Sequence, residues 1–248
     1  MREISNDNVI RNISFDQSEI LYNIMQLYNN GEPFECDITA SELKFYKKTK
    51  GDNYEIPEPK ILMDVYPQRD DIFQITPFEK LPLEDESISS IVVDLPFVIS
   101  PHTSPSSINP KDGSMLIFKR FSGFYPVGEM YENYYWWMKE CQRVIKPNGI
   151  IVWKTQSTVS GGIQHSTEEF SFMCANKLGL YTIDKFYLEA KARLISKTKI
   201  KKQCHARKYT SSFYVFQKDD KIANKTDYFK LLDEYTNTDL EHKIWELK

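Results

Sequence analysis

The sequence has few of the residues that build metal sites and disulfide frameworks. Its 248 residues include four histidines, nine glycines and four cysteines. The cysteines are widely scattered and form no C-x-x-C pair; they are Cys36, Cys141, Cys174 and Cys204. This pattern argues against both a zinc site and a disulfide framework. We therefore expect no resident metal and a reduced, cytoplasmic setting.

Long apolar runs and an excess of one charge are also missing. No stretch approaches the length of a membrane-spanning helix, and the first residues are too polar for a signal peptide, so no membrane association is expected. The formal net charge of -3 gives no global sign of a nucleic-acid-binding protein. Any basic surface must therefore be local. With 41% hydrophobic residues, the chain can bury the core of one domain and carry a small appendage.

Apolar patterns predict strands that alternate with helices. Seven strands are expected at 33–38, 60–65, 72–76, within 87–97, and at 150–154, 181–190 and 211–218. Helices are expected at 14–30, 129–146 and 166–178. Such an alternation is typical of an α/β fold with a mostly parallel sheet.

The stretch from Ser87 to Phe97 is central to this pattern. Ile91, Val92 and Val93 form a continuous apolar run, which favours a strand buried on both faces of a parallel sheet. Such sheets bind ligands beyond the carboxyl ends of their strands, where Asp94-Leu95-Pro96-Phe97 would lie. Taken by itself, this tetrapeptide is better explained as a turn after a strand. The surrounding segments favour a functional interpretation.

The tetrapeptide resembles the Asp/Asn-Pro-Pro-Tyr/Phe motif of methyltransferases that modify amino groups of nucleic-acid bases, with leucine at the second position. The run RVIKPNGIIVWKTQ, from Arg143 to Gln156, resembles a segment and the following strand of class I methyltransferases. Residues 203–208, QCHARK, resemble an element of small phage-type or bacterial DNA methylases. The resemblance covers residues 15–218. It implies a Rossmann-like fold with a mostly parallel seven-stranded sheet and helices on both faces.

The resemblance assigns the catalytic role to Asp94, Leu95, Pro96 and Phe97. Asp94 and the Leu95 carbonyl would accept hydrogen bonds from an exocyclic amine. These bonds let the nitrogen become more tetrahedral as it attacks a sulfonium methyl group. Phe97 would stack on a base that is turned out of its helix or single-stranded.

The implied cofactor is S-adenosylmethionine. Its site would include Asp37, Ile38, Thr39 and Ser41, because D-x-T-x-S after the first strand resembles the cofactor-proximal segment of the small methylases. Asp64 and Val65 end the second strand, where an acid commonly binds ribose hydroxyls. The relatives tend to carry a glycine where this sequence has Glu42-Leu43-Lys44. A helix-capping Asp or Thr is an equally good interpretation of the first segment alone.

Two segments are candidates for contacting nucleic acid. A Ser-, Pro- and Gly-rich loop spans 98–128, and a basic connection spans 191–210. Basic and aromatic residues of this kind suit phosphates and stacked bases. The candidate contact residues are Lys119, Arg120, Phe121, Lys199, Lys201, Lys202, His205, Arg207 and Lys208. A loop anchored by its aromatic rings and a merely solvated basic face are the alternatives.

The resemblance implies methyl transfer to an exocyclic base nitrogen, with adenine N6 preferred over cytosine N4 and DNA preferred over RNA. The methyltransferase domain would span 1–218, followed by a helical appendage at 219–248. A partner subunit could supply target recognition. Two alternatives stay open: an RNA base methyltransferase, or a catalytically silent nucleic-acid-binding or scaffold subunit. Leu95 and the missing glycine support the silent alternative.

Overall fold

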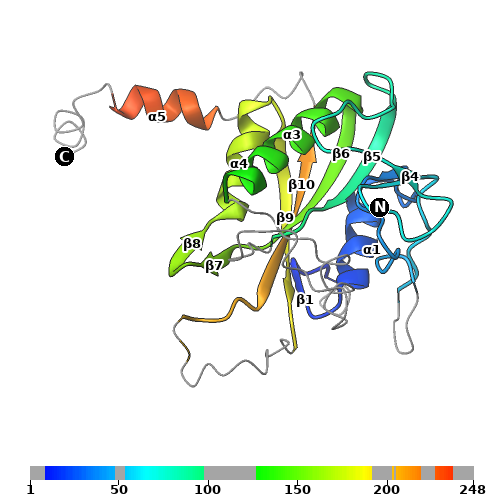
Figure 1. Cartoon of the computed structure of the whole chain (residues 1–248), viewed down its shortest axis with the longest axis horizontal. Coiled ribbons are helices and arrows are strands. Elements are labelled where there is room, and N and C mark those ends of the chain that lie inside the picture. The colour runs from blue at the N-terminus through cyan, green and yellow to red at the C-terminus, as the bar shows by residue number, and fades with distance from the viewer. Residues whose placement is uncertain are drawn as a thin grey trace, which may run out of the picture.

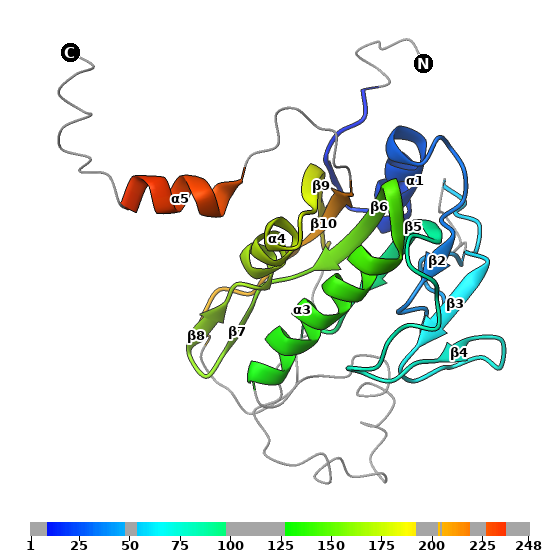
Figure 2. The same ribbon diagram turned by 90° about the horizontal axis from the view of Figure 1, so that it is seen from above.

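In a computed structural model, the described residues are 9–47, 54–97, 127–191, 203, 205–218 and 227–236. They form an α/β fold in which one large sheet carries helices on both faces (Figure 1; Figure 2). The strands are β1 (Ile13–Ser14), β2 (Cys36–Asp37), β3 (Ile61–Asp64), β4 (Phe73–Gln74), β5 (Ile88–Asp94), β6 (Ile145–Thr155), β7 (Thr158–Ser160), β8 (Ile163–His165), β9 (Tyr181–Glu189) and β10 (Thr210–Gln217). The helices are α1 (Gln17–Tyr28), α3 (Val127–Val144), α4 (Thr167–Lys177) and α5 (Tyr228–Thr236).

The large sheet has the strand order β1-β9-β10-β6-β5-β2-β3-β4. Neighbouring strands run parallel except around β10, which is antiparallel to both β6 and β9. This arrangement confirms the mostly parallel, Rossmann-like sheet that the sequence predicts. The carboxyl ends of β2, β5 and β6 therefore lie at the same edge as the start of β10. That edge is where open α/β sheets bind ligands.

Successive side chains of the central strands point to opposite faces of the sheet, and both faces are buried. Ile91 and Val93 of β5 pack on the face covered by α3, and Val92 packs on the face covered by α1; all three are fully buried. Ile151 and Val152 of β6 divide between the faces in the same way. This two-sided burial is why the sequence shows continuous apolar runs instead of alternation.

Helix α1 packs on one face of the sheet, and α3 and α4 pack on the other (Figure 2). The Asp16 side chain caps α1 by accepting a hydrogen bond from the Ser18 N–H at 2.9 Å. The helix ends before Gly31, whose φ of +76° suits the left-handed turn required there. These boundaries agree closely with the predicted helix.

The structure corrects several expectations about strands and the segments between them. The sheet has eight strands, because β1 pairs in parallel with β9 through two residues. Strands β2 and β4 are also two residues long, which is shorter than predicted. Helix α3 begins at Val127, inside the loop predicted for 98–128. A separate hairpin, β7–β8, follows β6 where no strands were expected.

Pro147-Asn148-Gly149, between the helix expected at 129–146 and the strand expected at 150–154, forms an irregularity within β6. The register shifts there: Ile88 pairs with Ile145, whereas Ser90 pairs with Ile150. Gly149 packs tightly against β5, since an added Cβ would lie 2.9 Å from the Ser89 carbonyl oxygen. Glycine is therefore required by close backbone approach.

The remaining described features concern the predicted appendage, membranes and metals. Helix α5 lies in the segment 219–248, and the Tyr228 ring meets Phe172 of α4 edge-on at 4.9 Å between centroids. None of the described helices is long and apolar enough to cross a membrane. Cys36, Cys141 and Cys174 are free and buried. Within the described ranges, no group of three or more His, Cys, Asp or Glu residues could hold a metal ion.

Candidate active site

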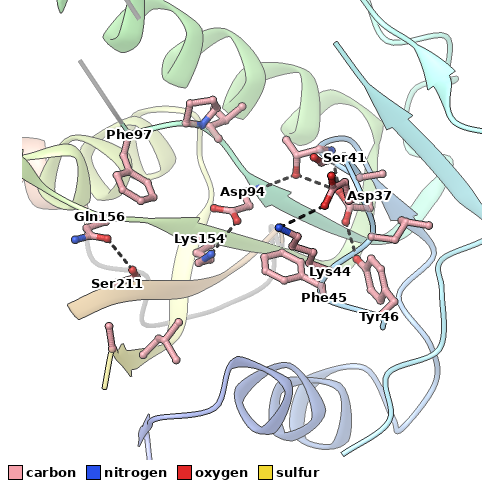
Figure 3. Close-up of a pocket in the computed structure, with 18 residues that line it drawn as sticks. Asp37, Ser41, Lys44, Phe45, Tyr46, Asp94, Phe97, Lys154, Gln156 and Ser211 are labelled. Atoms are coloured by element: carbon pink, nitrogen blue, oxygen red, sulfur yellow. Dashed lines mark hydrogen bonds and ion pairs between the residues drawn. The ribbon is translucent and has the colours of Figure 1, made fainter. Parts of the chain in front are cut away.

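A cavity of about 280 Å³ lies at the carboxyl edge of the sheet (Figure 3). Its walls come from Asp37 at the end of β2, from residues 39–46 that follow, from the end of β5, and from the adjoining ends of β6, β9 and β10. The predicted cofactor residues Asp37, Thr39 and Ser41 line this cavity together with the predicted catalytic motif, residues 94–97. The structure thus brings two separate sequence motifs to one place.

Asp37 is the buried centre of a hydrogen-bond network in this cavity. Its side chain is 1% exposed and accepts bonds from the Thr39 N–H at 2.7 Å, the Thr39 hydroxyl at 3.1 Å and the Tyr46 hydroxyl at 2.7 Å. Burial raises the pKa of Asp37 to about 7, although these bonds favour the charged form. The Thr39 Oγ also accepts the Asp94 N–H at 2.8 Å. The network therefore joins the end of β2 to the end of β5.

The loop after Asp37 turns without the glycine that the resemblance led us to expect there. Ser41 and Leu43 take left-handed conformations, with φ of +46° and +57°. Such conformations cost about 1–2 kcal/mol for a residue other than glycine. The Leu43 side chain is 1% exposed and packs in the core on the α1 face, which offsets this cost. The missing glycine therefore does not prevent the loop from forming a cavity wall.

Ile38, Asp64 and Val65, also predicted to bind the cofactor, do not line the cavity. Asp64 accepts the Ser41 N–H at 2.8 Å and the Tyr66 N–H at 2.7 Å, so it holds two backbone segments. Burial raises the pKa of Asp64. The Ile38 side chain is buried in the core on the α3 face, and Val65 packs against that core. A contact between Asp64 and ribose stays a prediction.

The motif at 94–97 is anchored by one buried side chain and by a hydrogen bond from α3. Leu95 is 5% exposed and packs into the α3-face core, which gives the departure from proline a packing reason. The buried Tyr134 hydroxyl donates a hydrogen bond to the Pro96 carbonyl at 3.3 Å. The Phe97 ring points toward the same side of the cavity as Asp94 and Gln156 (Figure 3).

Sequence reasoning missed Lys154, which lines the cavity beside Asp94. The two residues are register partners on β6 and β5, and the Lys154 Nζ lies 2.8 Å from the Asp94 Oδ2. Their side chains are 12% and 26% exposed, respectively. The Nζ also lies over the rings of Phe45, at 5.0 Å, and Phe213, at 5.7 Å. The available signal was a lysine directly after the buried run Ile150–Trp153.

Gln156 connects the cavity wall to the predicted basic connection. Its Oε1 accepts the Ser211 hydroxyl at 3.1 Å, and its Nε2 donates to the Lys208 carbonyl at 3.2 Å. Of the predicted nucleic-acid contacts, His205 and Arg207 are exposed and Lys208 is half-buried. The others lie outside the described residues: Lys119, Arg120, Phe121, Lys199, Lys201 and Lys202.

Replacing Asp37 with asparagine is expected to stabilise the fold at neutral pH. Between pH 4 and pH 7 the folded Asp37 holds its proton while the unfolded carboxyl loses it, so wild-type stability falls as pH rises through this window. The advantage of Asp37→Asn should grow from near zero at pH 4 to as much as about 4 kcal/mol above pH 7. Urea unfolding of both proteins across this range measures it.

The control for this measurement is Asp70→Asn at an exposed position, which should change the unfolding free energy by less than about 0.5 kcal/mol. An Asp37→Asn advantage that is the same at pH 4 and pH 7.5 would contradict the assignment of a raised pKa to this carboxyl.

No protein-family model and no curated protein sequence matches this chain. Among solved structures, it is similar to a protein assigned as a DNA modification methylase from Thermus thermophilus, complexed with S-adenosyl-L-methionine. That comparison gives 12% identity and a TM-score of 0.35, over 58% of this chain and 53% of the other. The cytosine-N4-specific PvuII DNA methyltransferase gives 17% identity and a TM-score of 0.35, over 55% and 44%.

A third similar structure is a protein from Galdieria sulphuraria assigned as a sarcosine dimethylglycine methyltransferase. It shares 14% identity at a TM-score of 0.44, over 82% of this chain and 85% of the other. The chain spans about half the length of the first two structures. At these TM-scores, the fold assignment depends on the strand order and the direction of β10.

Proposed function

We propose that this chain transfers a methyl group from S-adenosylmethionine to an exocyclic amino group of a nucleic-acid base, with adenine N6 in DNA as the preferred acceptor. One observation carries the proposal: a single cavity at the ligand-binding edge of the sheet contains both the 37–41 segment and the Asp94–Phe97 motif. These are the segments that the resemblance assigns to cofactor and acceptor.

The chemistry of the cavity fits a cationic cofactor. Two carboxylates, Asp37 and Asp94, lie with the hydroxyl-bearing residues Thr39 and Ser41 in its wall. Carboxylates suit the ammonium and sulfonium charges of S-adenosylmethionine, and hydroxyls suit its polar groups. The residues that would hold it are Asp37, Thr39 and Ser41. When bound, it would supply an electrophilic methyl group.

The 94–97 motif would bind the amine that receives the methyl group. Lys154 occupies the Asp94 Oδ2, and among the described residues nothing donates a hydrogen bond to Oδ1. Oδ1 and the Leu95 carbonyl can then each accept an N–H from the amine, and the carboxylate can accept the proton that the nitrogen loses. The bonds from the Asp94 N–H to Thr39 and from Tyr134 to Pro96 hold this segment in place beforehand. Such preorganisation is the main source of transition-state stabilisation.

A nucleic-acid substrate is supported by the segment before β10. His205, Arg207 and Lys208 follow one another closely there, and Lys208 is bound to the cavity wall through Gln156. Basic residues next to the cavity can contact phosphates that flank a base inserted into it.

The catalytically silent alternative also has an observation in its favour. The Lys154 ammonium already pairs with Asp94, so the motif has one free carboxylate oxygen instead of two. A scaffold subunit would keep this ion pair and transfer no methyl group. An RNA base methyltransferase would use the same cavity with an RNA substrate in place of DNA.

Calorimetric titration with S-adenosylmethionine, followed by labelled-methyl transfer to DNA and RNA oligonucleotides, tests the proposal. We expect saturable binding that Asp37→Ala weakens by about 10-fold or more, because the positive charge of the cofactor would favour the charged form of Asp37 and alanine removes that acceptor. Exposed Glu58→Ala is the control and should bind like wild type. Transfer to RNA alone would favour the RNA alternative. Absence of binding, with nucleic acid present or absent, would leave a scaffold.

A further inference from the structure

The cavity presents a hydrogen-bond acceptor and a hydrogen-bond donor side by side. They are the Asp94 carboxylate and the Lys154 ammonium, 2.8 Å apart on neighbouring parallel strands. We propose that Lys154 is a specificity-determining residue that donates a hydrogen bond to the ring nitrogen next to the target amine. This inference rests on the proposed function and names how its site selects the base.

Three contacts hold the Lys154 ammonium in the cavity. The ion pair with Asp94 fixes one of its donors, and the faces of Phe45 and Phe213 lie 5.0 and 5.7 Å from the Nζ. Its side chain is 12% exposed, so water has little access to it. An ammonium group has three donors. In the described part of the chain no second acceptor binds this one, so donors remain for a ligand.

The Watson–Crick edges of the bases match this pair in two cases and oppose it in the other two. Adenine has an amine, N6, beside an acceptor, N1; cytosine has N4 beside N3. Guanine and thymine reverse the order, with a carbonyl oxygen beside a ring N–H. An amine facing Asp94 therefore places an acceptor toward Lys154, whereas a carbonyl facing Asp94 sets two acceptors against each other. A site built to hydrogen-bond its substrate rejects analogues that leave buried polar groups unpaired.

The pair also explains why a partly buried lysine is tolerated next to the proposed reaction centre. Removing an ammonium from water is costly unless it is paired and hydrogen-bonded. Asp94 and the two aromatic faces compensate for this cost without a base present. A bound base would accept one of the remaining donors. Lys154 thus serves substrate recognition and not only local stability.

The test compares adenine with 1-deazaadenine, in which a C–H replaces N1, at one position of the same single-stranded oligonucleotide. Both binding affinity and methyl transfer are measured. For the wild-type protein, affinity and methyl transfer should each be about 10- to 100-fold lower with 1-deazaadenine than with adenine, as expected for the loss of a hydrogen bond to a charged group. The variant Lys154→Met should bind and methylate adenine less well than wild type does, and its affinity and transfer should not fall further with 1-deazaadenine. If transfer occurs at cytosine, 3-deazacytosine takes the place of 1-deazaadenine.

Three controls separate the possible causes. 3-Deazaadenine keeps N1 and should behave like adenine. Lys60→Met changes an exposed lysine before β3 and should discriminate like wild type. Lys154→Gln keeps a neutral donor and should recover part of the discrimination, which a variant that merely unfolds cannot do.

The outcomes for this inference and for the proposed function are distinct. Discrimination against 1-deazaadenine that persists in Lys154→Met, or that wild type lacks in both assays, overturns the role of Lys154. Binding that discriminates through Lys154 without any methyl transfer keeps the base-reading role and removes the proposed catalysis.

Discussion

Replacing Asp94 with alanine is expected to lower kcat for the proposed methyl transfer by about 10²- to 10³-fold, the usual effect of losing one preorganised electrostatic contact. Asp94 is the last residue of β5 and its side chain lines the cavity. Its backbone N–H donates a hydrogen bond to the Thr39 hydroxyl oxygen. Alanine removes the proposed acceptor for the amine, while the burial of Leu95 and the hydrogen bond from Tyr134 still hold residues 95–97 in position. Single-turnover assays with labelled cofactor measure the change.

The companion variant is Asp94→Asn, which keeps one carbonyl oxygen and should retain more activity than alanine. Cofactor affinity, measured by calorimetry, should fall less in either variant than in Asp37→Ala, because the residues proposed to hold the cofactor, Asp37, Thr39 and Ser41, are untouched. A comparison of thermal unfolding shows whether the unpaired Lys154 destabilises the fold. If alanine supports transfer at the wild-type rate, Asp94 is not the amine acceptor.

Replacing Arg143 with methionine is expected to destabilise the fold by about 3 kcal/mol, because it leaves a buried carboxylate without its partner. The Arg143 guanidinium donates to Glu140, which is 3% exposed, at 2.8 Å. It also donates to the carbonyls of Leu81 at 3.1 Å and Leu83 at 2.8 Å, and to Asp85 at 2.7 Å. One side chain therefore fastens the 81–85 segment to the end of α3.

Urea unfolding measures this effect, with the slope compared between proteins to confirm that the unfolded state is unchanged. Arg69→Met is the matched control, since Arg69 also pairs with two acids, Glu58 and Asp71, but at the exposed surface. Surface ion pairs contribute about 0–1 kcal/mol. Equal losses in the two variants would show that the buried network adds nothing beyond a surface pair.

The long buried strands were predictable because burial on both faces of the sheet requires a continuous run of apolar residues. The runs at Ile91–Val93 and Ile150–Trp153 locate β5 and the second half of β6, whose first residues, Ile145 and Lys146, were expected in the helix at 129–146. The two-residue strand β1 was not expected, and β2 and β4 are shorter than the strands expected at 33–38 and 72–76, because so short a strand contains no long run of residues buried on both faces. The hairpin β7–β8 did have a signal: Gly161-Gly162, with φ of +59° and +78°, is a typical two-residue hairpin turn.

The candidate site was predictable where a motif carried it and not where strand register decided it. Asp94 and Asp37 each follow an apolar strand, so both were expected at the carboxyl edge. The partnership of Lys154 with Asp94 depends on the register between β5 and β6, which a single sequence does not specify. Asp64 ends a strand as predicted, but both its oxygens bind backbone N–H groups.

The antiparallel strand β10 also decides when the sheet can be completed during synthesis. In the described sheet, β9 reaches β6 through β10, and β1 is attached through β9. The ribosome makes β9 before β10, so β9 and the early strand β1 must wait for residues 210–217 to emerge. A nascent chain that stalls before Thr210 therefore lacks β10 in the sheet, and β9 and β1 cannot yet join it, which leaves the β6 backbone open to pairing with another chain.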